Sequence, residues 1–435
     1  MGTRPAKRMQ RVAWGLASAF ALTAALSGCA TTNATPTLTW YINPDDGGQA
    51  VLAEKCTAEA NGEYRIETSL LPNDAASQRE QLARRLAAGD TTMDIMSLDP
   101  PFIPELAEPG FLAPVPEDVV QRTTQNVVQG ALDGAKWNGE FVTVPFWANT
   151  QILWYRKSVA EAAGLDMSKP VTWQQIMDAA KSQDKYLAVQ GARAESMTVW
   201  VNALIASAGG QIIQNPGAKG SEIQLGLDSE AGRKAAEIIG TIGKEGLGGP
   251  GLPTMNEGIS MSLFQGDKGS FMVNYNFIWP ATKGAIEEGA LPKDLLDDIG
   301  WAVYPRVDAN TPSAPPLGGI NLGVGAKSKN PDLAYKAIEC IVKPENQTEY
   351  FVTNGNAPSN KDAFDDAKVK ELFPMADTIR ESLDLAVPRP QTPYYNEIST
   401  GIQQTWAPPS QVDPATTPKE SQDFITAVLR GERLL

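Results

Sequence analysis

FVTVPFWANTQILWYRK, residues 141–157, is the segment from which the organisation of the chain can be predicted. Two apolar runs, 141–147 and 151–155, are joined by the short polar link Ala148-Asn149-Thr150, with no Gly-Asn or Asp-Gly hairpin turn between them. This pattern predicts one strand that passes through a joint, where the chain crosses from one body to another. Large aromatic side chains and an amide gather at the joint. Clefts between domains are where ligands most often bind, so the joint is the first place to look for a site.

Length and composition set the remaining bounds. A chain of 435 residues fits two domains of about 150 to 200 residues each, and 42% hydrophobic residues suffice for a sizeable core. The chain has no histidine, which removes the commonest general base and the usual catalytic triads. Neither GxGxxG nor GxxxxGK[ST] occurs, so no phosphate-binding loop is expected. These absences favour binding over catalysis.

The first 28 residues have the composition of an export signal. Four basic residues precede the apolar run 12–26, which at about 15 residues is shorter than the roughly 20 that a membrane-spanning helix needs. The ending LSGC resembles the bacterial lipobox, which implies that Cys29 becomes the lipid-modified first residue of the mature protein; an ordinary cleaved signal is the alternative. Residues 29–36 would then be a lipid-anchored tether, and the body would lie outside the cytoplasmic membrane.

The mature chain is strongly acidic. Removing the signal takes away four positive charges, so the net charge goes from −14 to −14 − 4 = −18. Such an excess of negative charge argues against nucleic acid or anionic lipid as the ligand.

Two further cysteines, Cys56 and Cys340, lie in the helical patterns AVLAEKCTAEA and LAYKAIECIVK. In an oxidising compartment a single disulfide between them is the natural interpretation, and it would place an early and a late helix in one domain. Two free buried thiols are the alternative. No metal site is expected, because histidine and CxxC spacing are both missing, and no cofactor is expected.

The early chain alternates strands and helices. Strands are predicted at 38–42, 64–71 and 93–98, with helices at 49–60 and 75–88 between them and a polar helix at about 117–128 further on. This order predicts an α/β body with a mainly parallel sheet. Ligands of such sheets bind beyond the carboxyl ends of the strands, where Asn43, Asp46 and Asp99 lie.

A second α/β body is predicted after the joint. Its expected strands are 186–189 and 269–277, and its expected helices include 172–180, 196–207, 229–242 and 256–264. Strands at 298–304 and 318–325 are expected to return the chain to the first body. Two bodies joined by two or three crossings permit hinge closure over a ligand.

The order of the motifs resembles that of a known family. LSGC, LTWYIN, DIMSLD, KWNGEFVTVPFWANTQILWYRK, TWQQI, EGISMSLFQGDKGSFMVNYNFIW and GGINLGVG followed by NPDLAYKAIECI span essentially the whole mature chain. The combination resembles the extracellular solute-binding lipoproteins of sugar ABC importers, the maltose-binding-like family. QLARRLAAGDTTMDIMSLD, NTQILWYR, the two cysteines, GGINL and VPRPQTPYY are similar to the actinobacterial trehalose-binding lipoproteins within it.

The resemblance implies an α/β periplasmic-binding-protein-like fold, in which two Rossmann-like lobes are joined by a hinge. Residues 37–148 and 302–345 would form the N-terminal lobe, and residues 149–301 and 346–435 the C-terminal lobe. It further implies a monomer that captures an α-linked disaccharide, with trehalose favoured, and delivers it to an ABC permease without breaking a bond. Maltose or maltodextrin is the alternative ligand. A secreted glycosidase-like enzyme, with Asp99 and Glu257 as its carboxylates, is the alternative of another class.

Carried over residue by residue, the resemblance also implies a set of sugar contacts. Asp99 would bind sugar hydroxyls, Asn149 would supply an amide at the crossing, and Glu257 would accept further hydroxyl hydrogens. Gly319 would offer backbone groups, and Arg389 would donate a bidentate fork to vicinal hydroxyls.

The aromatic contacts are less determined. The family's usual tryptophan after Val-Asn is replaced by Tyr275, which keeps a stacking face and adds a hydroxyl. Of the two tryptophans at the joint, Trp147 is expected to face the cleft and Trp154 the core. Asn43, Asp46 and Gln78 complete the candidate set. Structural roles remain open for several of these: a strand end for Asp99, a turn amide for Asn149, a helix N-terminal carboxylate for Glu257, core packing for Tyr275 and a surface ion pair for Arg389.

Overall fold

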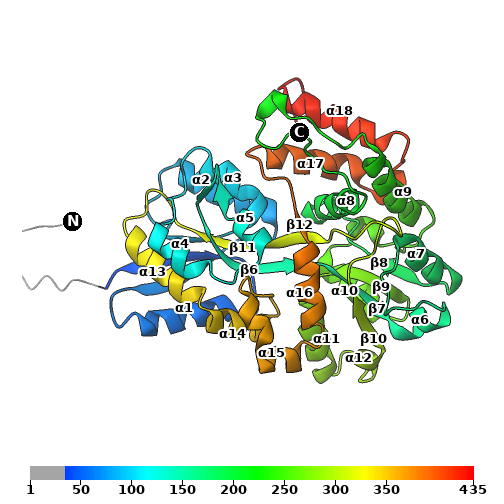
Figure 1. Ribbon diagram of the computed structural model, residues 1–435, viewed down its shortest axis with the longest axis horizontal. Coiled ribbons are helices and arrows are strands. Elements are labelled where there is room, and N and C mark those ends of the chain that lie inside the picture. Colours follow the sequence, from blue (N-terminus) through cyan, green and yellow to red (C-terminus); the bar gives the residue numbers. More distant parts are fainter. Residues whose placement is uncertain (1–34) are drawn as a thin grey trace, which may run out of the picture. The chain divides into compact units, whose positions relative to one another are not determined.

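Two larger β-sheets, each with its own helices, organise residues 35–435, the part of the chain that the computed structural model describes (Figure 1). The export signal and Cys29 lie outside these described residues. Within 35–435, none of the helices combines the length and the apolar character that crossing a membrane requires.

The first sheet contains the early α/β segment. β1 (Thr37–Ile42) lies between two parallel neighbours, β2 (Arg65–Leu70) and β3 (Ile95–Leu98). The connections run through α1 (Gly48–Glu59) and α2 (Ala75–Ala87). Asp74 caps α2, since its side chain accepts a hydrogen bond from the backbone N–H of Ser77.

Three later strands complete this sheet. β11 (Pro316–Gly323) pairs antiparallel with β3, β6 (Val144–Thr150) pairs antiparallel with β11, and the two-residue β12 (Val387–Pro388) pairs parallel with β11. The early strands β1, β2 and β3 pair parallel, as predicted, and three of the five pairings in this sheet are parallel. The sheet as a whole is mixed, because β11 pairs antiparallel with both β3 and β6.

The second sheet has the order β10-β7-β9-β8. Its strands are β7 (Ile152–Arg156), β8 (Tyr186–Ala188), β9 (Gly269–Asn274) and β10 (Ile299–Ala302). β9 ends at Asn274, three residues before the predicted end. β10 was expected to return the chain to the first body, but it pairs with β7, with Ile299 opposite Arg156. Only β11 of the two expected return strands enters the first sheet.

The crossing is made of two strands rather than one. β6 ends at Thr150 in the first sheet and β7 begins at Ile152 in the second, so Gln151 alone separates them. Gln151 is 1% exposed, and its Nε2 donates to Oε1 of Gln190 at 3.1 Å. The predicted crossing between bodies is found here, whereas the single continuous strand is wrong.

Helices cover both sheets and each sheet has its own apolar core. Trp40, Phe146 and Leu322 belong to the core of the first sheet. Trp173 and Trp200 belong to the core of the second, which packs α7 (Trp173–Ser182), α8 (Glu195–Ser207), α9 (Glu230–Lys244), α17 (Tyr395–Trp406) and α18 (Thr417–Leu429) together. The helices α17 and α18 therefore lie with the second body although they follow β12 of the first sheet (Figure 1).

The remaining helices and strands complete the two bodies. They are α3 (Ile103–Ala107), α4 (Glu117–Thr123), α5 (Gln129–Asp133), β4 (Lys136–Trp137), β5 (Glu140–Phe141), α6 (Lys157–Ala162), α10 (Glu257–Gln265), α11 (Ile278–Glu287), α12 (Leu295–Asp298), α13 (Pro331–Ile341), α14 (Pro344–Asn354), α15 (Ala367–Leu372) and α16 (Ala376–Leu385). The predicted helix near 117–128 ends early, at Thr123, and Asn126 beyond it has a left-handed φ of 56°.

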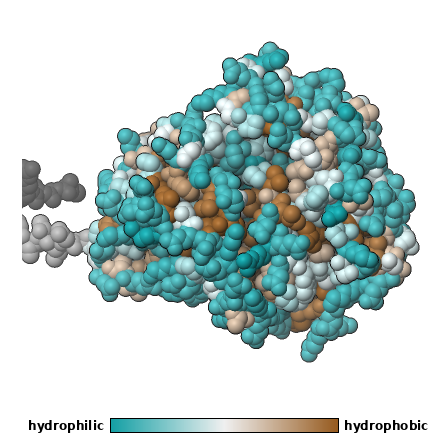
Figure 2. All heavy atoms as spheres, in the orientation of Figure 1, coloured by the Kyte–Doolittle hydropathy of each residue, from teal (hydrophilic) through white to brown (hydrophobic). Residues whose placement is uncertain are grey.

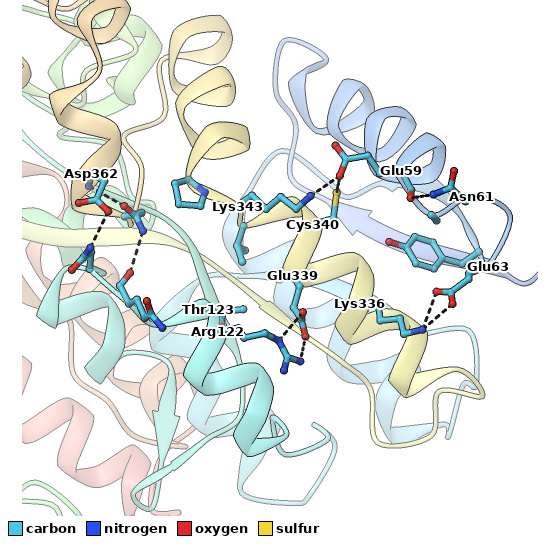
Figure 3. Close-up of a pocket in the computed structure, with 17 residues that line it drawn as sticks. Glu59, Asn61, Glu63, Arg122, Thr123, Lys336, Glu339, Cys340, Lys343 and Asp362 are labelled. Atoms are coloured by element: carbon cyan, nitrogen blue, oxygen red, sulfur yellow. Dashed lines mark hydrogen bonds and ion pairs between the residues drawn. The ribbon is translucent and has the colours of Figure 1, made fainter.

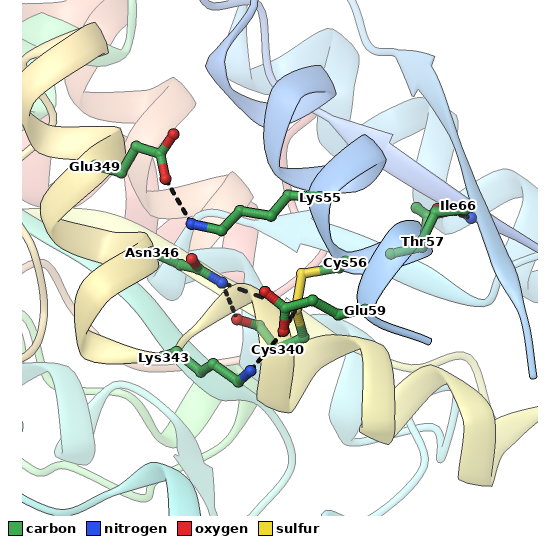
Figure 4. The surroundings of a disulfide bond; sticks show 9 residues. All are labelled: Lys55, Cys56, Thr57, Glu59, Ile66, Cys340, Lys343, Asn346 and Glu349. Carbon is green, nitrogen blue, oxygen red and sulfur yellow. Dashed lines mark hydrogen bonds and ion pairs between the residues drawn. A yellow bond between two sulfur atoms is a disulfide. The ribbon is translucent and has the colours of Figure 1, made fainter. Parts of the chain in front are cut away.

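A disulfide joins Cys56 of α1 to Cys340 of α13, with the two Cα atoms 5.8 Å apart (Figure 4). Polar contacts flank it. Lys343 Nζ donates to a carboxylate oxygen of Glu59 at 2.6 Å, and Asn346 Nδ2 donates to the carbonyl oxygen of Cys340 at 2.6 Å. The bridge fixes an early helix against a late one, as predicted from the helical patterns around the two cysteines.

The face shown in Figure 2 is mostly hydrophilic, and its hydrophobic atoms gather in the middle. Figure 1, in the same orientation, shows β6, β11 and β12 running through this middle region between the two groups of helices. The candidate site lies along these strands.

Candidate ligand-binding site

The geometry of the site starts from β11. β6 pairs with one edge of β11 from Leu317 to Leu322, so β3 and β12 share the other edge. β3 runs against β11 and ends opposite Asn321, while β12 runs along β11 and ends opposite Leu317. The residues that follow these two strands, Asp99 and Arg389, therefore approach each other from opposite directions along the edge of β11.

Asp99 and Arg389 meet in a two-pronged ion pair. Nη2 of Arg389 donates to Oδ1 of Asp99 at 2.6 Å and Nη1 donates to Oδ2 at 3.1 Å. A second carboxylate, Glu195 at the start of α8, accepts from Nη1 through Oε1 at 2.7 Å. The side chain of Arg389 is only 6% exposed, against 18% for Asp99 and 20% for Glu195. The structural alternative of a surface ion pair for Arg389 is therefore wrong.

The pKa values of Asp99 and Arg389 are both shifted from their ordinary values. Desolvation raises the pKa of Asp99 above its ordinary value, and the positive charge of Arg389 offsets part of that rise. Desolvation alone would lower the pKa of Arg389, but its interactions with Asp99, Tyr395, Glu195 and Tyr275 together outweigh that effect, so the pKa lies well above its ordinary value. The guanidinium is therefore charged at neutral pH.

The second sheet contributes Tyr275 and Glu257. Tyr275 follows β9, whose last residue lies opposite the first residue of β7, so Tyr275 stands beside the crossing. Asn274 donates through Nδ2 to the carbonyl oxygen of Glu257 at 3.0 Å, which holds the start of α10 against the end of β9. Both predicted residues are partly buried.

The charges of the predicted residues influence the pKa of the Tyr275 hydroxyl. Burial raises the pKa of this tyrosine. Four charged side chains also act on it: Arg389 lowers the pKa, and Glu257, Asp99 and Glu195 raise it. Burial likewise raises the pKa of Glu257, and the charge of Glu195 adds to the rise. Residues far apart in sequence and belonging to both sheets thus lie within one electrostatic environment.

Trp147, Asn149 and Gly319 lie on the strands that border this environment. Trp147 is 7% exposed, and its ring centroid lies 5.3 Å from that of Tyr350. It also lines a small cavity together with Arg389, whereas Trp154 is fully buried and donates to the carbonyl oxygen of Asn274. Asn149 is partly exposed near the end of β6 and faces Gly318 of β11.

Gly319 has a structural reason to be glycine. Its φ is +133°, and a Cβ atom there would lie 2.2 Å from the carbonyl oxygen of Trp147. The close approach of β6 and β11 at the crossing depends on this residue.

Asn43 and Gln78 lie together, while Asp46 stands apart from them. Nδ2 of Asn43 donates to Oε1 of Gln78 at 2.7 Å, and Oδ1 of Asn43 is buried without a hydrogen-bond partner among residues 35–435. Asp46 is exposed in the turn before α1. Its neighbour Asp45 accepts instead from the backbone N–H groups of residues 47 and 49 and from the hydroxyl of Tyr350.

A larger cavity of about 710 Å³ lies elsewhere, near the disulfide (Figure 3). Six of its charged side chains form three ion pairs. Arg122 bonds Glu339 at 2.6 Å, Lys336 bonds Glu63 at 2.9 Å and Lys343 bonds Glu59 at 2.6 Å, all drawn in Figure 3. None of the predicted ligand residues lines it. The polar cluster at the crossing, rather than this cavity, is the candidate site.

Sequence reasoning missed Glu195. The signal was present, because the loop before it follows the carboxyl end of β8, where ligand groups of α/β sheets gather. Within the described residues no group of three or more histidine, cysteine, aspartate or glutamate side chains is arranged to hold a metal ion.

Two α/β bodies with a polar site at the crossing between them define a two-lobed solute-binding protein. The chain belongs to the family of bacterial extracellular solute-binding proteins, whose sequence profile matches residues 52–376. Membership of this family makes the chain a binding protein and not an enzyme.

One curated relative is a probable ABC transporter-binding protein of Deinococcus radiodurans. It is 26% identical over 278 residues, which cover 60% of this chain and 62% of that protein. The match therefore spans less than two thirds of the length of that relative.

Solved structures share the fold over nearly all of both chains. Maltose-bound MalE3 of T. maritima has a TM-score of 0.77 at 23% identity, covering 91% of this chain and 99% of that one. MalE of Xanthomonas citri, a sugar-binding protein, has a TM-score of 0.74 at 19% identity, covering 91% and 98%. The GacH receptor of Streptomyces glaucescens, solved unliganded and with acarbose, has a TM-score of 0.73 at 19% identity, covering 92% and 98%. These matches confirm the two-lobed α/β fold that was predicted.

Proposed function

We propose that this chain is the substrate-binding component of an ABC sugar importer, which captures an α-linked disaccharide, trehalose, between its two bodies and delivers it to a membrane permease. Membership of the solute-binding family supports the binding role. The choice of a sugar rests on the site itself.

The observation that carries the proposal is the cluster around the hydroxyl of Tyr275. It combines carboxylates (Asp99, Glu257), a buried guanidinium (Arg389) and an aromatic ring. Carboxylates accept the hydroxyl hydrogens of a sugar, a guanidinium donates to two of its oxygens at once, and an aromatic face packs against the apolar side of a pyranose ring. Asn149 at the crossing and Trp147 beside Arg389 would extend this surface.

The arrangement also suggests how binding is coupled to closure. Asp99 follows β3 of the first sheet, whereas Tyr275 follows β9 of the second and Glu257 begins α10 beside it. A disaccharide that contacts both sets makes its full complement of hydrogen bonds only when the bodies are closed, so it shifts the equilibrium toward the closed state. Gln151, the single residue between β6 and β7, is the proposed pivot.

Maltose is the second candidate ligand, because the similar MalE3 structure of T. maritima is described as maltose-bound. Isothermal titration of the chain from residue 30 onward against trehalose, maltose, sucrose and glucose separates the candidates. Trehalose should bind more tightly than the other three. Binding of maltose without binding of trehalose would transfer the assignment to maltose, and binding of none would remove the sugar proposal.

The proposal includes an extracytoplasmic, monomeric protein anchored through a lipid on Cys29. Cys29 carries the anchor in the LSGC sequence, which lies outside the described residues. The wild-type protein should be recovered with membranes, and Cys29→Ser should move it to the soluble fraction. An unchanged distribution would contradict the anchor without touching the sugar assignment.

A further inference from the structure

The guanidinium of Arg389 faces more negative charge than it can neutralise. Asp99 and Glu195 both bond it, and Glu257 is a third carboxylate acting on the same tyrosine hydroxyl. Only Arg389 supplies positive charge among the four residues that act on this hydroxyl.

Arg389 nevertheless keeps donors for a ligand. A guanidinium has five N–H groups. Both hydrogens of Nη1 are used, one by Asp99 and one by Glu195, and one hydrogen of Nη2 is used by Asp99. No acceptor among residues 35–435 bonds Nε, so Nε–H and the second Nη2–H remain. These two hydrogens lie on one edge of the planar group and form a two-donor fork.

Glu195 is held firmly in the position that produces this arrangement. Ser399 and Gln403 of α17 donate to its Oε2 at 2.7 and 3.4 Å, and the hydroxyl of Tyr395 donates to its Oε1. The ring of Tyr395 also lies beneath the guanidinium, 5.9 Å from its central carbon. The helix α17 therefore fixes both Glu195 and the arginine that it pairs with.

We propose that Glu195 is a specificity-determining residue, which makes the site accept uncharged polyhydroxyl ligands and refuse anionic ones such as sugar phosphates. The inference rests on the proposed sugar-binding function and names its ligand class. An arginine with free charge binds phosphate and carboxylate through its fork. With Asp99 and Glu195 both in place, the fork donates hydrogen bonds while an anion meets an excess of like charge.

The test compares two ligands that differ in charge, trehalose and trehalose 6-phosphate, by isothermal titration. Glu195→Gln keeps the shape of the side chain and removes its charge. Asp298→Asn is the matched control, since Asp298 is similarly exposed at 22% and bonds Arg156 at 2.6 Å in the second body, away from the site. The wild type should prefer trehalose strongly, Glu195→Gln should reduce this preference roughly tenfold or more, and Asp298→Asn should leave it unchanged.

A loss of structure alone would weaken the binding of both ligands and leave the ratio of their affinities unchanged. The inference is overturned if Glu195→Gln has the same ratio of affinities for trehalose and trehalose 6-phosphate as the wild type. It is also overturned if the wild type binds trehalose 6-phosphate as tightly as trehalose.

A measurement without sugar separates this inference from the proposed function. If the wild type binds no sugar, the sugar assignment fails, and inorganic phosphate becomes the probe. The Nε–H signal of Arg389 in ¹⁵N-labelled protein is identified by its loss in Arg389→Lys. Phosphate should leave this signal in place in the wild type and shift it in Glu195→Gln. A shift in both proteins, or in neither, would overturn the role of Glu195.

Discussion

Replacing Arg389 by methionine should destabilise the ligand-free protein far more than an ordinary ion pair would. The change keeps most of the apolar stem and removes the one charge that compensates Asp99 and Glu195, which are 18% and 20% exposed. Removing one partner of a buried ion pair costs about 3 to 5 kcal/mol, because the remaining charge is left buried without compensation. Asp99 loses its hydrogen-bond donors, whereas Glu195 keeps Tyr395, Ser399 and Gln403, so the cost comes mainly from Asp99.

The matched control is Arg156→Met. Arg156 bonds Asp298 at 2.6 Å, with side chains 19% and 22% exposed, and Asp298 keeps the backbone N–H and hydroxyl of Ser158 as donors when the arginine is lost. The control should therefore cost only about 1 kcal/mol, as expected for a hydrogen-bonded pair that remains partly solvated. Urea unfolding of both variants measures the difference.

The penalty in Arg389→Met should also depend on pH. Burial already raises the pKa of Asp99, and Arg389 offsets part of the rise, so losing the arginine raises the pKa further. A carboxyl group whose pKa is higher in the folded than in the unfolded state binds its proton more tightly when folded. The destabilisation is therefore full at neutral pH and is relieved as the pH falls toward the ordinary range of a carboxyl, about 4. If the cost equals that of the control and does not change between pH 7 and pH 5, Arg389 does not compensate buried carboxylates.

Three further predictions concern other parts of the molecule. Unreduced, denatured protein should show no reactive thiol at Cys56 or Cys340, and two titratable thiols would contradict the disulfide. Replacing both cysteines by alanine should lower the free energy of unfolding by up to roughly 5 kcal/mol, the value that the chain-entropy model gives for so long a loop. Glu257→Gln should weaken sugar binding yet raise the urea midpoint of the ligand-free protein at neutral pH. Burial raises the pKa of this carboxyl, so the folded state is more stable when the side chain is uncharged. A lower urea midpoint would contradict this prediction. Gly319→Ala should lower the free energy of unfolding, measured with urea, by roughly 2 kcal/mol or more, because the added Cβ meets a carbonyl oxygen of β6 at a residue with positive φ. The control Gly284→Ala in α11, where a Cβ would have nothing within 4 Å, should not lower it. Equal effects of the two substitutions would contradict the prediction.

The early α/β segment could be predicted from the sequence because its signals are local. Continuous apolar runs and helical spacing located β1, α1, β2, α2 and β3 within a few residues. The rule that ligands gather beyond the carboxyl ends of strands then pointed to Asp99.

Strand partners and the full charge cluster could not be predicted in the same way. The pattern of residues 298–304 indicates a strand but does not say which sheet it joins, and its pairing with β7 depends on contacts distant in sequence. β12 has only two residues, too few for any periodicity, yet it positions Arg389 beside Asp99. Glu195 looked like an ordinary acidic residue in the first turn of a helix, and only the fold brings it to the guanidinium.

The bond between Cys56 and Cys340 has a consequence for the covalent topology of the chain. It closes a ring that contains the crossing and every strand of the second sheet, because β7 to β10 all lie between the two cysteines in sequence. A protease that cuts once anywhere inside this ring opens it without releasing a fragment. On a denaturing gel, protein cut once in this ring would therefore run as one band until it is reduced. Where proteases are present, both bodies would stay in one molecule after such a cut.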